Sequence, residues 1–204
     1  MSADGRATAV FEPAAVYREL EGHIEPVDMP DDPIKPVGRA YRFSPGTVPF
    51  RKMAQVHFAV PKGESVVGLG VYEWTDKGWA FVWNDVDSTR NTVWAGVRHF
   101  SIYALLRDDT PPDVNILSPC DGATTKPQPT FAVSMKDSLS GIPMEKLISF
   151  DLDGETMIFE YDPEADEAKG LLRRPLSPGA HRLVVRVSDT SGNETIATSQ
   201  FTVE

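Results

Sequence analysis

Aspartates gather beside a proline pair near the middle of the chain and in two later polar turns. Aspartate carboxylates and loop carbonyls can supply the roughly six to eight oxygens that calcium requires. The same side chains also cap turns by accepting hydrogen bonds from nearby backbone N–H groups, and no Asp-x-Asp-x-Asp loop decides between the two interpretations. Calcium is therefore the one cofactor that the sequence suggests. Its candidate ligands are Asp109, Asp113, Asp137 and Asp189, with Asp108 adjacent.

The histidines and the cysteine do not form the patterns that hydrolases use. His23, His57 and His181 occur singly, without the His-x-His or His-x-x-x-His spacing of zinc enzymes. Cys120 has no histidine beside it in the sequence, and as the single cysteine it can form no intrachain disulfide. Neither a phosphate-binding glycine-rich loop nor a Gly-x-Ser-x-Gly elbow is present. We therefore expect no enzyme active site.

The composition is that of a soluble globular protein with an acidic surface. Hydrophobic residues make up 41% of the 204 residues, charged residues 25%, and the net charge is −10. Nucleic-acid binding requires a basic face, and the Lys/Arg residues of this chain cluster no further than adjacent pairs such as Arg173-Arg174. No stretch approaches the roughly 18 apolar residues of a membrane helix. We expect neither a nucleic-acid partner nor membrane insertion.

Residues 105–113, Leu-Leu-Arg-Asp-Asp-Thr-Pro-Pro-Asp, divide the chain into two stretches. Two consecutive prolines remove two backbone donors and hold the chain extended, so neither a helix nor a central strand can pass through them. Each half is about 100 residues long, which is enough for an ordinary domain. The predicted boundaries are a first domain over 1–107, a linker over 108–112 and a second domain over 113–204.

Short alternating apolar runs separated by Gly, Pro, Asn and Asp occur in both halves. They predict an all-β protein made of two tandem β-sandwich domains. The second is expected to be immunoglobulin-like, because it has seven short strands with frequent turns. One or two helical turns are expected over 13–20, and an extended connection over 29–37. Strands are predicted over 7–11, 22–27, 40–43, 54–60, 66–74, 79–83, 92–100, 101–106, 113–116, 130–135, 147–152, 155–161, 170–173, 179–188 and 195–203.

Two turns predict hairpins. Gly78 follows Thr75-Asp-Lys between aromatic strands, and Asp153-Gly154 separates two further strands; glycine supplies the positive φ that a tight hairpin needs. In the run after the second hairpin, alternation predicts that Leu183, Val185 and Val187 face the core.

The tryptophans have two interpretations. Exposed on one face they would form a platform for carbohydrate, whereas alternating aromatics in a sandwich usually pack in the core or as cross-strand pairs. The first interpretation requires that at least two of them share an exposed face. They are Trp74, Trp79, Trp83 and Trp94.

Both halves resemble known families. Residues 110–204 resemble the immunoglobulin-like repeats of bacterial surface and secreted proteins, through Thr110-Pro-Pro, Asp137-Ser-Leu-Ser-Gly-Ile, Leu152-Asp-Gly and Ser188-Asp-Thr-Ser-Gly-Asn. Residues 11–106 are similar to a bacterial relative of the β-sandwich domain of ankyrins and netrin receptors, through the three segments Tyr41-Arg-Phe-Ser-Pro, Val48-Pro-Phe and His99-Phe-Ser-Ile-Tyr-Ala-Leu. That family's glycine-rich first strand is missing before Ala7, so we expect a fragment of a longer protein.

The second resemblance implies a candidate reaction. Some sandwiches of the ankyrin and netrin-receptor type cleave themselves at a similar triplet, in which the hydroxyl attacks the preceding carbonyl, the histidine acts as base and a strained backbone drives the acyl shift. Here the triplet is His99, Phe100 and Ser101, and the scission would fall between Phe100 and Ser101. The alternative is an ordinary strand segment with Phe100 in the core.

These observations favour a non-catalytic spacer and interaction module of a larger bacterial cell-envelope or secreted protein. Its expected partners are other domains of the parent protein or envelope and surface proteins. The expected location is extracellular or in the cell envelope, with a signal peptide upstream of Met1. Two alternatives stay open: the self-cleaving module described above, and an adhesin segment that binds carbohydrate or protein.

Overall fold

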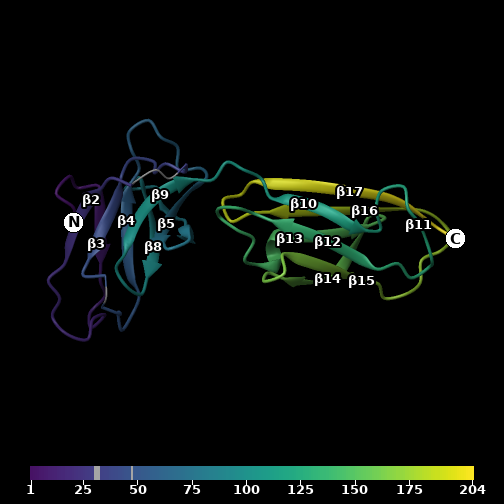
Figure 1. The fold of residues 1–204 in the computed structure, drawn as a ribbon, viewed down its shortest axis with the longest axis horizontal. Coiled ribbons are helices and arrows are strands. Elements are labelled where there is room, and N and C mark those ends of the chain that lie inside the picture. The colour runs from purple at the N-terminus through teal and green to yellow at the C-terminus, as the bar shows by residue number, and fades with distance from the viewer. Residues whose placement is uncertain (30–32, 47) are drawn as a thin grey trace. The chain divides into compact units, whose positions relative to one another are not determined.

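A computed structural model describes residues 1–29, 33–46 and 48–204 of the chain. The protein is all-β, with its strands in several sheets, as Figure 1 shows. The chain divides into two compact units, Met1–Asp109 and Thr110–Glu204, and each unit has its own hydrophobic core. The division falls inside the proline-containing segment 108–112. Residues 30–32 of the predicted extended connection lie outside the described residues.

The described part of the first unit contains two antiparallel sheets, with the strand orders β1-β4-β8-β7 and β2-β3-β9-β5-β6. In β4 and β8 every second residue is buried, because successive side chains of a strand point to opposite faces. Each of these strands therefore has one apolar inner face and one outer face. The strands are β1 (Ala7–Val10), β2 (His23–Val27), β3 (Ala40–Ser44), β4 (Ala54–Ala59), β5 (Leu69–Thr75), β6 (Gly78–Trp83), β7 (Asp85–Asp87), β8 (Thr92–Val97) and β9 (Ile102–Arg107).

Aromatic rings fill much of the first core. The Phe50 and Phe100 rings meet edge to face with their centroids 4.9 Å apart, and those of Phe43 and Tyr103 do so at 5.6 Å. Such edge-to-face pairs are favourable beyond the area they bury. Phe100 is only 3% exposed, so its ring anchors the short segment between β8 and β9 in the core.

The second unit contains eight strands in the order β10-β12-β15-β14-β13-β16-β17-β11. Asp153 and Gly154 join β13 to β14 with φ values of 56° and 86°, as the predicted hairpin requires. The prediction that Leu183, Val185 and Val187 face the core is confirmed, since each is 0% exposed. The strands are β10 (Asp113–Ser118), β11 (Thr124–Thr125), β12 (Phe131–Lys136), β13 (Ile148–Leu152), β14 (Glu155–Asp162), β15 (Glu167–Leu171), β16 (Gly179–Ser188) and β17 (Glu194–Val203).

The sequence prediction was wrong in a few weakly patterned segments. The helical turns expected over 13–20 are turns and bends, and Ala14 has a φ of 61° that interrupts a right-handed helix. The strands β7 and β11 were not predicted, because one is mostly polar and the other has only two residues. Among the described residues the single helical element is the 3-10 turn η1, Glu145–Leu147. None of the described residues form a helix long and apolar enough to span a membrane.

The separate cores lead to a first prediction. Replacing Leu183 with Ala should lower the free energy of unfolding of the second unit by about 2–5 kcal/mol, because it leaves a cavity at a fully buried site. All four tryptophans lie in the first unit, so tryptophan fluorescence follows only that unit during urea denaturation, while far-UV circular dichroism follows both. We expect a lower midpoint by circular dichroism and an unchanged midpoint by fluorescence.

The matched control is Leu105→Ala in the first core, where Leu105 is 2% exposed. This variant should move the fluorescence midpoint. An equal fluorescence shift in both variants would show that the two units unfold as one cooperative body.

Candidate functional site

Two of the predicted calcium ligands lie close together in the second unit. Oxygens of the Asp137 and Asp189 carboxylates are within 4.8 Å of each other. Asp137 Oδ2 accepts hydrogen bonds from the backbone N–H groups of Leu139 at 3.0 Å and Gly141 at 2.7 Å. Its Oδ1 is buried and has no hydrogen-bond partner among the described residues. Two carboxylate oxygens at this separation can both reach one cation.

Asp189 is 1% exposed and organises its own loop. Its Oδ1 accepts the backbone N–H of Asn193 at 2.9 Å, and its Oδ2 accepts the side-chain amide of the same residue at 2.8 Å. Both carboxylates therefore perform the turn-capping role that was the alternative to metal binding. These are the capping bonds that the Asp-Ser-Leu-Ser-Gly and Asp-Thr-Ser-Gly-Asn patterns predict, and calcium binding stays a prediction.

The other predicted calcium ligands have different surroundings. Asp113 is exposed at the start of β10, where its Oδ1 accepts the side-chain amide of Asn115 at 3.2 Å. Asp108 and Asp109 belong to the first unit. The backbone N–H of Asp108 donates to the Gly68 carbonyl at 2.9 Å, and Asp109 Oδ1 also lies near Gly68.

The triplet His99, Phe100 and Ser101 lies between β8 and β9. The imidazole Nε2 of His99 is 2.8 Å from Glu73 Oε1, and its carbonyl accepts the hydroxyl of Tyr103 at 2.9 Å. The described residues show no hydrogen bond between the imidazole and the Ser101 hydroxyl, and none of the three residues has a positive φ. The geometry thus gives the imidazole a carboxylate partner rather than the hydroxyl that an acyl shift would activate.

His181 forms a second histidine–carboxylate pair. Nδ1 lies 2.7 Å from Asp153 Oδ2, and Nε2 lies 2.8 Å from the Ser177 carbonyl. Both ring nitrogens can donate only in the imidazolium form, so the bond to Asp153, followed by that to Ser177, raises the pKa of His181. The ring also stacks on Phe201 with a centroid distance of 5.6 Å. The pair lines a hollow of about 790 Å³, but its Nε2 faces a carbonyl and not a nucleophile.

His57, by contrast, has a pKa that burial holds below its ordinary value. Its ring stacks on Trp94 across β4 and β8, with a centroid distance of 5.6 Å and an interplanar angle of 18°. Nε2 lies 3.0 Å from Gln55 Oε1, which is an acceptor, so the neutral ring donates this hydrogen bond.

The tryptophans divide into two groups. Trp74 and Trp79 are directly opposite each other in the β5–β6 hairpin, and their rings meet edge to face at 5.1 Å. Gly78, in the turn between them, has the expected positive φ of 101°. Trp83 and Trp94 instead line one hollow at the surface of the first unit, and Trp83 is 40% exposed. Trp74 and Trp79 thus form a cross-strand pair, which was one of the two interpretations, and the carbohydrate platform stays a prediction.

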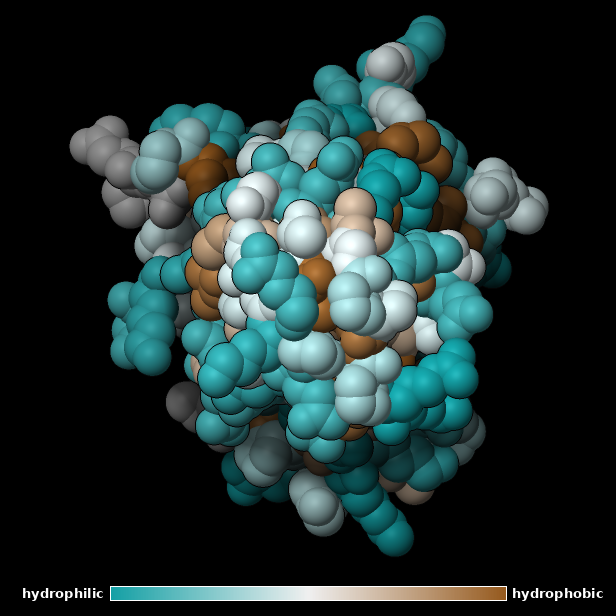
Figure 2. All heavy atoms as spheres, turned by 90° about the vertical axis from the view of Figure 1, so that its right-hand side faces the viewer, coloured by the Kyte–Doolittle hydropathy of each residue, from teal (hydrophilic) through white to brown (hydrophobic). Residues whose placement is uncertain are grey.

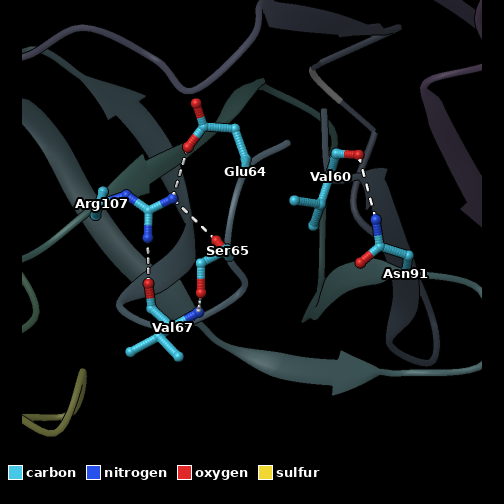
Figure 3. A network of polar contacts seen from close by, with 6 residues as sticks. All are labelled: Val60, Glu64, Ser65, Val67, Asn91 and Arg107. Atoms are coloured by element: carbon cyan, nitrogen blue, oxygen red, sulfur yellow. Dashed lines mark hydrogen bonds and ion pairs between the residues drawn. The ribbon is translucent and has the colours of Figure 1, made fainter. Parts of the chain in front are cut away.

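A polar network holds the loop between β4 and β5, as Figure 3 shows. The Arg107 guanidinium donates to Glu64 Oε2 and to the Ser65 carbonyl, each at 2.9 Å, and to the Val67 carbonyl. Three acceptors on one guanidinium fix the loop against the end of β9. This network was not predicted, because its acceptors are mostly backbone carbonyls that carry no sequence signal.

Figure 2 looks onto the end of the second unit where the C-terminus lies. Hydrophilic side chains cover most of this face, and apolar side chains show between them in separate areas. Exposed single apolar residues are normal on soluble proteins.

Comparisons with known proteins give little further information. No family model matches the chain, and no curated protein matches it. Among solved structures, the dimeric latent PorU from Porphyromonas gingivalis matches with 13% sequence identity and a TM-score of 0.36. The match covers 81% of this chain and 21% of that one, so this chain spans about a fifth of the PorU chain.

The His181 pair leads to a prediction of pH dependence. Because the pKa of His181 is raised in the folded state, its contribution to stability is fully present below about pH 6.5 and is lost as the pH rises through the folded-state pKa. The stability advantage of the native protein over a His181→Gln variant should therefore be larger at about pH 5.5 than at about pH 8.5. Urea denaturation followed by circular dichroism measures this difference.

Asp153→Asn tests the proposed cause of the pH effect. Asparagine tolerates the positive φ at this position but removes the charge, so it should weaken the pH dependence contributed by His181. His23→Gln, at an exposed histidine of the first unit, is the control. An advantage over His181→Gln that grows as the pH rises would contradict the assignment.

The Asp137 loop leads to a further prediction. Asp137→Ala removes the acceptor of two backbone N–H groups, and we expect it to lower the free energy of unfolding of the second unit by about 1–3 kcal/mol. Asp113→Ala, at an exposed site, should change it by less than about 0.5 kcal/mol.

We expect both effects to be the same with and without millimolar calcium. A calcium-induced rise in the melting temperature that Asp137→Ala abolishes would instead support an ion between Asp137 and Asp189.

Proposed function

We propose that the chain is a non-catalytic structural and interaction module of a larger bacterial cell-envelope or secreted protein. In this proposal the two compact units are tandem β-sandwich domains, and the second is immunoglobulin-like. The partners would be other domains of the parent protein or proteins of the envelope and surface. The observation that carries the proposal is the separate, closed core of each unit, since a module of this kind must fold without help from its neighbours.

The strand order supports an immunoglobulin-like second unit. Immunoglobulin domains place strands A, B, E and D in one sheet and C, F and G in the other. If the strands from β10 onward are lettered in chain order, with the two-residue β11 left out, the observed order β10-β12-β15-β14 corresponds to A-B-E-D. The continuing order β13-β16-β17 corresponds to C-F-G.

The contacts of the titratable side chains support a structural role. His99 and His181 are each engaged with a carboxylate, and Asp137 and Asp189 cap their own loops. Cys120 is exposed and its Sγ is 3.1 Å from the Leu117 carbonyl. Nucleophilic catalysis of the Ser–His or Cys–His type requires a base within hydrogen-bond reach of the nucleophile, and none of these contacts joins such a pair.

The linker supports a spacer role on chemical grounds. Five residues separate β9, which ends at Arg107, from β10, which begins at Asp113, and two of them are the prolines Pro111 and Pro112. Proline restricts φ, and a polyproline segment is semi-rigid compared with a Gly/Ser linker. Such a linker would limit the motion of one unit relative to the other.

Intact mass tests the non-catalytic role against self-cleavage. After purification and incubation at neutral pH, we expect a single species of 22.5 kDa on a denaturing gel and by mass spectrometry. The Ser101→Ala variant should behave in the same way, because the hydroxyl has no catalytic role in the proposal. Two fragments that meet between Phe100 and Ser101, and that disappear in Ser101→Ala, would establish the self-cleaving alternative.

A further inference from the structure

The hollow that Trp83 and Trp94 share lies on the outer face of the sheet β1-β4-β8-β7. In β8 the side chains of Val93, Ala95 and Val97 are buried in the core, so alternation places Trp94 and Gly96 on the opposite face. The register pairs Gly96 with Gln55 of β4, and Gln55 with Val10 of β1. The hollow therefore lies over Gly96, Gln55 and Val10, which are neighbours on the adjacent strands β8, β4 and β1.

The missing side chain of Gly96 lets Met53 lie over this face, and both residues line the hollow. A Cβ atom at this position would lie 2.5 Å from Cε of Met53, so the end of the methionine side chain occupies the space that a larger residue would need. Met53 is itself 49% exposed. Its flexible thioether can move outward without disturbing the core, which makes the floor of the hollow adaptable.

The walls combine indole rings with polar groups. Trp83 reaches the hollow from the end of β6, next to the point where the chain crosses to β7, and Trp94 reaches it from β8. The hollow has a volume of about 440 Å³, which is in the range of small-ligand sites. Its polar lining consists of Gln55, Asp85 and Glu12, and the Glu12 carboxylate is paired with Lys52 at 3.4 Å.

Gln55 and Asp85 supply donors and an acceptor. Because Gln55 Oε1 accepts the hydrogen bond from His57, its amide N–H groups face other partners, and they have none among the described residues. The Asp85 carboxylate likewise has no hydrogen-bond or ion-pair partner in the part of the chain that the structure describes. No lysine or arginine lines the hollow, so an anionic ligand would meet a carboxylate without a compensating cation.

We propose that this hollow binds a neutral saccharide. Sugar rings present an apolar face that packs on indole and a rim of hydroxyls that both donate and accept hydrogen bonds. This fits a site with two tryptophans, an amide donor and carboxylate acceptors. A quaternary ammonium ion would gain from the indoles and Asp85, but it would face the amide N–H groups of Gln55 without any acceptor for them. The inference goes beyond the structural role proposed above and does not depend on it.

The full chain can be tested by titration with cellohexaose, maltohexaose and N-acetylchitohexaose while the indole N–H signals of the four tryptophans are followed by NMR. At least one of these sugars should shift the Trp83 and Trp94 signals in a saturable way and leave the Trp74 and Trp79 signals in place. Trp83→Ala should weaken binding about tenfold or more, through the loss of a stacking surface. Gly96→Val should have a similar effect, because it fills the hollow.

Trp74→Ala is the matched control, because it removes a tryptophan of the same unit that lies outside the hollow, and it should leave the affinity unchanged. Melting curves identify any variant that fails to fold, and Trp83→Ala, at a residue 40% exposed, remains informative if Gly96→Val is unstable. No saturable shift with any of the three sugars would overturn the proposal. Equal losses in Trp74→Ala and Trp83→Ala, or saturable binding of choline chloride in place of the sugars, would overturn it as well.

Discussion

Successive side chains of a β-strand point to opposite faces of its sheet, and the rest of the structure depends on this constraint. Burying apolar side chains is the main favourable term in folding, and in a strand only alternate residues can contribute to one core. In β16, Leu183, Val185 and Val187 are fully buried, while the arginines between and beside them point away. A shift of one residue in register would exchange these two sets, so the core determines which side chains reach the solvent.

Packing of the first core also determines which residues the His99–Phe100–Ser101 segment contacts. Phe100 packs against Phe43 and Phe50 in the first core, which holds the residues on either side of it in place. His99 then meets Glu73 of the neighbouring strand β5, and the backbone carbonyl of Ser101 accepts the N–H of Phe43. The residues on both sides of the Phe100–Ser101 peptide bond are thus held by contacts with other strands, and none of the three residues of the triplet has a positive φ.

The alternation of apolar and polar residues made many of the strands predictable from the sequence. Segments without this alternation were not predicted correctly. Strands with several apolar residues, such as β4 and β8, could be found, and so could the Asp153-Gly154 hairpin, because glycine in a tight turn has a direct backbone signature. The strand β7 has one apolar residue in three and, among the described residues, pairs with β8 alone, which a local pattern cannot reveal. The expected helical turns failed for a related reason, because one or two turns are too short to be stable without tertiary support.

One candidate site could be predicted from the sequence and another could not. The proximity of Asp137 and Asp189 could be expected from the predicted immunoglobulin-like topology, in which their loops lie at one end of the domain. The hollow beside Trp83 and Trp94 could not be expected, because it depends on the pairing of Gly96 with Gln55 and on the path of the chain between two sheets. When inner faces are filled by core residues, ligand recognition is confined to outer faces, loops and edges. A glycine on an outer face, between aromatic residues, is then one of the few ways in which a sandwich can make room for a small ligand without losing any of its core.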